Sequence, residues 1–126
     1  MYSGNKRSAL VGKAGEDFVA HYLKSKGYII VKRNWRDGRY GELDIVAENH
    51  ECIAFVEVKT RQSNSLVSGA QAVDIAKQQR TKNAANTFMR RLRTQLPPRI
   101  DVAEVVIVDE KDGVFQFELN YIENAF

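Results

Sequence analysis

The chain has 126 residues, which is long enough for a real hydrophobic core, and we expect residues 1–126 to form a single domain. Its composition, 44% hydrophobic and 28% charged, is typical of a globular protein. No apolar run approaches the roughly 18 residues of a membrane helix, and the N-terminus lacks a signal-peptide core, so we expect no membrane partner. The single cysteine, Cys52, excludes an internal disulfide, which agrees with a cytoplasmic location.

Charge is unevenly distributed along the chain, whose formal net charge is +3. The first 41 residues hold nine basic and three acidic side chains, and seven basic residues with no acid lie between Asp74 and Asp101. Two basic regions around an acid-rich middle could clamp a polyanion around a metal site. The alternative is a pair of solvated helices, because a modest basic excess is a weak signal of nucleic-acid binding.

The first half of the chain predicts a helix followed by strands. Apolar side chains at helical spacing predict an amphipathic helix over residues 7–26, ended by Gly27. A β-rich run predicts a strand over 28–35, and a turn or loop follows at 36–39. Residues 42–48 alternate between apolar and polar side chains and predict the second strand, with Leu43, Ile45 and Ala47 on one face.

The second half predicts a third strand over 52–60, a loop over 63–69 and a long helix over 70–94. Pro97 and Pro98 follow that helix and end it. A nearly apolar strand is expected over 100–108, and a short strand over 114–119.

The predicted order of elements is therefore αβββαβ with one added strand. We expect Asp101, which enters the fourth strand two residues after Arg99, to pair with an arginine.

Strands 42–48 and 52–60 are expected to form an antiparallel hairpin with Asn49 and His50 as its two-residue turn. Paired positions then sum to 99, so Asp44 lies opposite Phe55 and diagonal to Glu57 on one face. This prediction depends on the turn, because a slip of one residue would put the two carboxylates on opposite faces.

Two carboxylates about 4 Å apart repel by about 4 kcal/mol at an effective dielectric near 20. A divalent cation removes that cost, and hard oxygen ligands suit Mg²⁺. The sequence thus indicates a metal site made by Asp44, Glu57 and the carbonyl of Val58, with Lys59 near the attacking water or the phosphate. The alternative is an ordinary solvated strand face or a cross-strand ion pair.

The run from Asp44 to the E-V-K of Glu57–Lys59, after a helix that carries a glutamate and before a long basic helix, resembles the PD-(D/E)XK nuclease superfamily. That superfamily has a restriction-endonuclease-like αβββαβ core, an α/β fold with a mixed central sheet flanked by helices. Within it, six motifs in order are similar to the YraN-type family of small bacterial proteins. These motifs are GKAGE (12–16), GY (27–28), RNWR (33–36), GELDIV (41–46), FVEVKTR (55–61) and RIDV (99–102).

The resemblance assigns roles to individual residues. Asp44 matches the metal-binding aspartate, Glu57 the second acidic ligand and Lys59 the catalytic lysine. Glu16 matches the acidic residue on the first helix that closes the same site in resolvase-like members; otherwise it is an ordinary helix glutamate. Leu43 stands where the superfamily motif nominally has proline.

The resemblance implies a Mg²⁺- or Mn²⁺-dependent endonuclease that hydrolyses phosphodiester bonds of DNA, branched or structured. A homodimer is plausible, because resolvase-like enzymes cut two strands and this chain has one site. Gln71 and Lys77 lie near the superfamily's variable fourth motif, and we predict no catalytic role for either. Four arginines flank the strand ends and are candidates for phosphate contacts: Arg33, Arg36, Arg39 and Arg61.

Two other classes of function stay open on the sequence. A non-catalytic nucleic-acid-binding module could keep the fold and its charges, and a structural domain could use the ion pairs in a protein interaction. A module that only binds nucleic acid does not need two neighbouring carboxylates. A protein-interaction domain should show no affinity for nucleic acid.

Overall fold

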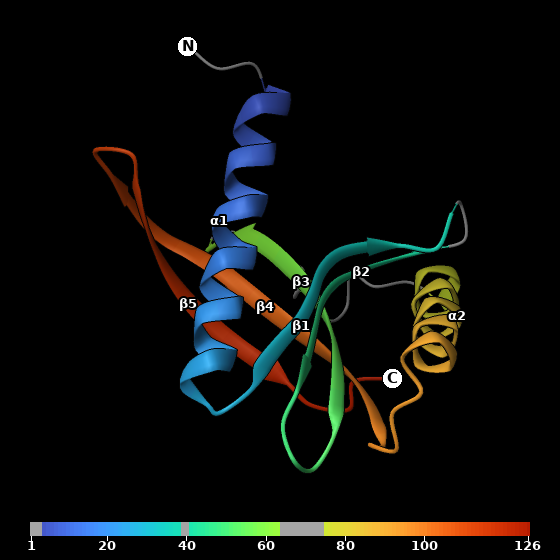
Figure 1. The fold of residues 1–126 in the computed structure, drawn as a ribbon. Coiled ribbons are helices and arrows are strands. Elements are labelled where there is room, and N and C mark those ends of the chain that lie inside the picture. The colour runs from blue at the N-terminus through green and yellow to red at the C-terminus, as the bar shows by residue number, and fades with distance from the viewer. Residues whose placement is uncertain (1–3, 39–40, 64–74) are drawn as a thin grey trace.

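A computed structural model of the chain describes residues 4–38, 41–63 and 75–126, and Figure 1 shows their arrangement. The described elements are α1 (Gly4–Ser25), β1 (Ile29–Arg36), β2 (Glu42–Glu48), β3 (Ile53–Gln62), α2 (Ile75–Leu92), β4 (Pro98–Lys111) and β5 (Val114–Ile122). This order is the αβββαβ core with an added strand that the sequence predicts. Neither helix of the described part is long and apolar enough to cross a membrane.

The five strands form one mixed sheet in the order β1-β2-β3-β4-β5. All neighbouring pairs are antiparallel except β3 and β4, which are parallel. A parallel pair needs a crossover connection, and here the connection contains α2. The predicted mixed central sheet is therefore confirmed.

The helices pack against opposite faces of the sheet. Ile45 and Val56 join α1 in one buried cluster, whereas their chain neighbours Val46 and Phe55 join Phe88 of α2 in a second cluster. Successive strand residues point to opposite faces, so the two clusters lie on the two sides of the sheet. The paired middle of β2 and β3 is therefore buried on both faces, and its residues, Ile45–Ala47 and Ile53–Val56, are all apolar.

The predicted first and last residues agree best with the structure for β2 and least well for β4 and β5. Strand 42–48 is confirmed residue for residue, whereas β4 begins at Pro98 and extends to Lys111. Proline is tolerated as the first residue of a strand because it is not needed there as a ladder donor. Of the predicted helix over 70–94, residues 70–74 lie outside the described part of the chain.

The predicted register of the β2–β3 hairpin is wrong by two residues. Val46 pairs with Phe55, so paired positions sum to 101 and not to 99. The amide of Asn49 donates to the carbonyl of Cys52 at 3.1 Å, and its side-chain oxygen accepts from the amide of Glu51 at 2.8 Å. Asn49 thus stands before the turn and caps it, as asparagine often does, and the two central residues are His50 and Glu51.

This correction brings the two acids closer in register. A shift of two residues keeps every side chain on its predicted face. Continued along the strands, the observed register places Asp44 level with Glu57, where the prediction had them diagonal.

The predicted alternation of β2 fails at one position. Leu43 joins the cluster on the α2 side with Val46, although it was expected to share a face with Ile45. Asn34, which lies between the pairs Arg33↔Ile45 and Trp35↔Leu43, has a positive φ of 53°. Such a residue interrupts the regular pleat, so this end of the β1–β2 hairpin turns towards α2.

The expected pairing of Asp101 with an arginine is confirmed. Asp101 is fully buried, and its Oδ1 accepts from Arg99 Nε at 2.9 Å. Tyr121 donates to Oδ2 at 2.6 Å, and the amide of Asn124 donates to Oδ1 at 2.9 Å. This network joins the start of β4 to the end of β5 and to the C-terminal segment.

Candidate metal centre

Strands β2 and β3 separate beside Asp44. Their pairing runs from Glu48↔Ile53 to Ile45↔Val56, and beyond it β2 stays with β1 while β3 continues along β4. In the opening, Asp44 Oδ2 accepts a hydrogen bond from the amide of Val58 at 2.9 Å. The hydrogen bond from Val58 to the side chain of Asp44 therefore takes the place of the next backbone hydrogen bond between β2 and β3.

The backbone of Val58 contributes a second oxygen to this opening. The N–H and C=O groups of one strand residue point to the same edge of the strand. Since the amide of Val58 faces Asp44, its carbonyl also faces the gap that β2 leaves.

Asp44 and Glu57 form a charged pair in a poorly hydrated place. Burial, followed by the charge of Glu57, raises the pKa of Asp44 to about 7. Glu57 is only 3% exposed. The two carboxylates therefore repel each other as the sequence predicts, and this repulsion adds to burial in holding back the ionisation of Asp44.

Two lysines neutralise Glu57. The ammonium group of Lys59 lies 3.4 Å from Glu57 Oε1, and Lys77 contacts the same oxygen from the first turn of α2. Burial and the adjacent Lys77 lower the pKa of Lys59; for Lys77, burial has the same effect, but hydrogen bonds to Glu57 and Lys59 outweigh it and raise the pKa.

Lys77 is the third described residue of α2, because the described part of the chain resumes at Ile75. Glu57 supplies a negative charge beside this lysine. The sequence places Lys77 near the variable fourth motif and predicts no catalytic role for it; its contact with Glu57 is not visible in the sequence.

Glu16 is brought to the same region by a close helix–strand contact. A Cβ atom on Gly15 would lie 2.2 Å from Thr60 Oγ1, so only glycine allows α1 to approach β3 this closely. Glu16 Oε1 is buried and has no hydrogen-bond partner among the described residues. Burial raises the pKa of Glu16, and its charge in turn contributes to the raised pKa of Asp44.

These groups fit a hard cation. Within the described residues, no three Asp, Glu, His or Cys side chains come together as metal ligands. Mg²⁺ commonly binds proteins through only one or two carboxylates and keeps several waters. Asp44 and Glu57 would hold such an ion, the carbonyl of Val58 could add a ligand, and the buried oxygen of Glu16 is a further acceptor nearby.

The three described candidates for phosphate contacts, Arg33, Arg36 and Arg61, lie in different surroundings. Arg33 pairs with Asp17 at 2.8 Å and lies 3.7 Å from Glu16, whereas Arg36 is exposed and pairs with Glu42 at 3.1 Å. Arg61 pairs with Glu104 on β4 at 2.5 Å. Arg39 lies outside the described residues. A phosphate role for these arginines stays a prediction.

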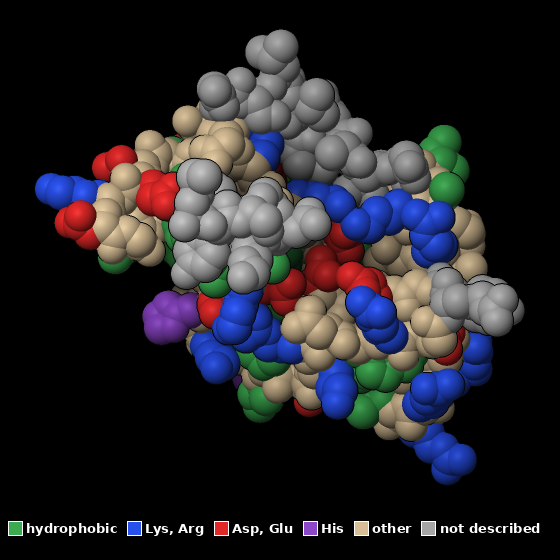
Figure 2. Space-filling model, turned by 90° about the horizontal axis from the view of Figure 1, so that it is seen from above, with side chains coloured by type: hydrophobic (Ala, Val, Ile, Leu, Met, Phe, Trp, Pro, Cys, Tyr) green, Lys and Arg blue, Asp and Glu red, His purple; other side chains and the backbone are tan. Residues whose placement is uncertain are grey.

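Sequence reasoning also missed Glu104. It is 3% exposed, and it pairs in register with Lys59 on the parallel neighbour β4. The signal in the sequence is an acid within the apolar run that follows Asp101 in this strand, from Val102 to Val108. Figure 2 shows acidic side chains near the centre of one face, with lysine and arginine side chains around them.

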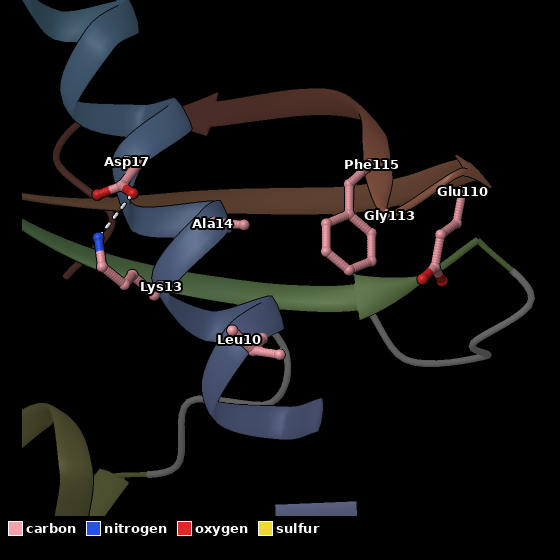
Figure 3. Close-up of a pocket in the computed structure, with 7 residues that line it drawn as sticks. All are labelled: Leu10, Lys13, Ala14, Asp17, Glu110, Gly113 and Phe115. Carbon is pink, nitrogen blue, oxygen red and sulfur yellow. Dashed lines mark hydrogen bonds and ion pairs between the residues drawn. The ribbon is translucent and has the colours of Figure 1, made fainter. Parts of the chain in front are cut away.

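A separate cavity lies between α1 and the β4–β5 hairpin (Figure 3). It has a volume of about 480 Å³ and is lined by Leu10, Lys13, Ala14, Asp17, Glu110, Gly113 and Phe115. The cavity shares no residue with the acidic site, and its lining is mainly apolar. The chemistry described above is thus placed at the strand fork and not in this hollow.

The fold and site define a small α/β protein with a pair of carboxylates at the fork between two strands. The chain belongs to the uncharacterised protein family UPF0102, whose model matches residues 15–105. This is the YraN-type family that the motifs indicate, so the resemblance is confirmed.

Individual members of the family are similar over most of the chain. A UPF0102 protein of Bacteroides thetaiotaomicron is 38% identical over 116 residues, which cover 92% of this chain and 91% of that protein. A UPF0102 protein of Alkaliphilus metalliredigens is 41% identical over 120 residues, covering 94% of this chain and 99% of the relative. A UPF0102 protein of Symbiobacterium thermophilum is also 41% identical over 120 residues, which are 94% and 98% of the two chains.

Proposed function

We propose that this protein is a metal-dependent endonuclease that hydrolyses phosphodiester bonds of DNA, with branched or otherwise structured DNA as its substrate. One observation carries the proposal: Asp44 and Glu57 lie together at the fork of β2 and β3, and burial with the charge of Glu57 raises the pKa of Asp44 to about 7. A fold gains no stability from two such carboxylates, whereas a cation site requires them.

In this reaction the residues of the site would have different roles. Mg²⁺ or Mn²⁺, when bound, lowers the pKa of its water and polarises a phosphate oxygen. Asp44 and Glu57 would hold the ion. Lys59, 3.4 Å from Glu57, is placed to donate to a phosphate oxygen or to orient the attacking water. Arg36, whose side chain is 77% exposed, is available to a neighbouring phosphate.

A second candidate is a nucleic-acid-binding module without catalysis. The observation that favours it is the contact of both Lys59 and Lys77 with Glu57 Oε1, because two ammonium groups already neutralise that carboxylate. In this alternative the lysines replace the metal ion. Binding of DNA would then be unchanged by EDTA, and no cleavage would occur.

A cleavage assay separates the two candidates. The protein is incubated with end-labelled duplex, flap, four-way junction and RNA substrates, with Mg²⁺, with Mn²⁺ or with EDTA. The proposal predicts metal-dependent products from at least one DNA substrate, most from the branched ones. Binding without products under all metal conditions would favour the non-catalytic module, and absence of binding would favour a protein-interaction domain.

A further inference from the structure

Strand β4 places a carboxylate directly beside Lys59. In the parallel β3–β4 pair, Lys59 is the register partner of Glu104, just as Glu57 is the partner of Val102. Register partners project from the same face of a sheet, with Cβ atoms about 5 Å apart. Glu104 therefore shares a face with Glu57 and Lys59, although it comes from another strand.

Only one oxygen of Glu104 has a partner in the described part of the chain. Oε1 accepts from Arg61 Nε at 2.7 Å and lies 2.5 Å from Arg61 Nη2. Oε2 is buried and has no hydrogen-bond partner among the described residues. A buried carboxylate oxygen without a donor is costly, and such exceptions in folded proteins often indicate a functional group.

Glu57, in contrast, has two ammonium donors at one of its oxygens. Lys59 and Lys77 both approach its Oε1, and Lys59 is the more distant at 3.4 Å. A cation held by Glu57 and Asp44 would repel these ammonium groups. Lys59 would then need another acceptor, and the unpartnered Oε2 of Glu104 belongs to its nearest neighbour on β4.

We propose that Glu104 is a positioning residue for Lys59: its second carboxylate oxygen receives the ammonium group when a cation occupies the Asp44–Glu57 pair. Lys59 thereby stays charged and close to the scissile phosphate without competing with the metal ion for Glu57. The inference rests on the metal site of the proposed function. It adds a residue from β4 to a site otherwise built by α1, β2, β3 and α2.

The test is a double-mutant cycle read out as Mn²⁺ affinity, measured by isothermal titration calorimetry on the full chain without DNA. In Glu104→Gln, the one remaining acceptor oxygen is held by Arg61, so Lys59 stays near the ion and Mn²⁺ binding should weaken by at least about tenfold. Lys59→Met should then restore most of this affinity in the Glu104→Gln background. In the wild-type background, Lys59→Met should change the affinity by less than about threefold.

Two further variants separate this role from simpler ones. Glu118→Gln removes an exposed carboxylate on β5 and should leave Mn²⁺ affinity nearly unchanged. Glu104→Asp keeps the charge but shortens the side chain by one methylene group, so it should also weaken Mn²⁺ binding. Lys59→Met should restore the affinity in this background as it does in Glu104→Gln. This variant also carries the test if Glu104→Gln proves to be misfolded by circular dichroism.

The outcomes distinguish this inference from the function on which it rests. If Lys59→Met has the same effect in both backgrounds, Glu104 acts only through its general field or through Arg61, and the positioning role is overturned. If the wild-type protein binds no Mn²⁺, the metal site itself is wrong and the inference falls with it. If Mn²⁺ binding follows the predicted cycle but no substrate is cleaved, the role of Glu104 stands and the nuclease proposal fails.

Discussion

The carboxylate of Asp44 accepts a hydrogen bond from the backbone amide of Val58 at 2.9 Å, across the opening where β2 leaves β3. This contact ties an acidic side chain to the strand that carries Glu57 and Lys59. It lowers the cost of holding Asp44 there, yet burial and the charge of Glu57 still raise the pKa of Asp44 to about 7. The stability of the protein should therefore report directly on this residue.

Asp44→Asn should stabilise the metal-free protein at neutral pH. In the folded state the pKa of Asp44 is raised to about 7 from an ordinary value of 3.8, so its protonated form favours folding. This contribution is complete below pH 4 and is lost as the pH rises to about 7. Wild type and Asp44→Asn should be similar at pH 4, and at pH 8 the variant should be more stable by about 2–4 kcal/mol.

Urea denaturation in EDTA at several pH values measures this difference. Asp109→Asn, at an exposed position on β4, is the matched control and should differ from wild type by less than about 0.5 kcal/mol at every pH. A destabilised Asp44→Asn variant at pH 8 would contradict the account, because it would make Asp44 part of a stabilising ion pair.

Gly15 and Gly12 of α1 should respond oppositely to alanine. A Cβ on Gly15 would lie 2.2 Å from Thr60 Oγ1, whereas a Cβ on Gly12 has no atom within 4 Å. Gly15→Ala should therefore cost about 1–3 kcal/mol by overpacking, and Gly12→Ala should gain up to about 1 kcal/mol from helix propensity. Thermal or urea unfolding measures both effects.

Thr60→Ala provides the internal check of this contact. If the clash with Thr60 is the cause, Gly15→Ala should destabilise the Thr60→Ala variant much less than it destabilises the wild-type protein. Additive losses would show that Gly15 is needed for another reason.

Substitutions in the Asp101 network should be among those that lower the stability of the fold most. Asp101→Ala removes the buried acceptor shared by Arg99, Tyr121 and the amide of Asn124, and it should cost about 3–5 kcal/mol. Tyr121→Phe removes one hydrogen bond to the carboxylate and should cost about 1.5–3 kcal/mol.

The control for this network is Glu123→Gln, because Glu123 is 65% exposed and lies 3.7 Å from Arg99. Its effect should stay within about 0.5 kcal/mol. Equal effects of Tyr121→Phe and Glu123→Gln would mean that the buried network contributes little to the stability of the fold.

Arg36 and Arg33 should differ in the salt dependence of DNA binding. The side chain of Arg36 is 77% exposed, whereas Arg33 is held by Asp17 at 2.8 Å. Arg36→Ala should reduce the slope of log K against log salt by about 0.9, the value for one phosphate contact on duplex DNA. Arg33→Ala should reduce the slope by less, because Arg33 must first leave Asp17, and it should also lower the free energy of unfolding.

Fluorescence anisotropy in EDTA at several salt concentrations measures the slopes without cleavage. The reverse order of effects would show that Arg33 leaves Asp17 to contact the nucleic acid.

The sequence predicts the elements of this protein better than their mutual placement. Residues 42–48 alternate cleanly, so the bounds of β2 follow from local pattern alone. The hairpin register does not follow from it, because the sequence predicts Asn49 within the turn, whereas its side chain caps the residues that form the turn. The prediction of the face on which Asp44 lies is still correct, because the predicted register is shifted by two residues and not by one.

The parts of the site that come from distant strands and helices could not be predicted in this way. Glu104 lies beside Lys59 only because β3 and β4 are parallel and in a particular register. Lys77 contacts Glu57 only because α2 packs beside the strand fork. Asp44 and Glu57 were accessible to sequence reasoning because a single short hairpin joins them.

The central claim is that Asp44 and Glu57 together hold a catalytic cation. The most direct measurement compares cleavage of a labelled branched DNA in Mn²⁺ by wild type, Asp44→Asn and Glu57→Gln, with the fold of each variant checked by circular dichroism. The account predicts metal-dependent cleavage by wild type and a loss of at least about 100-fold in both folded variants. Cleavage at the wild-type rate by both variants would contradict it.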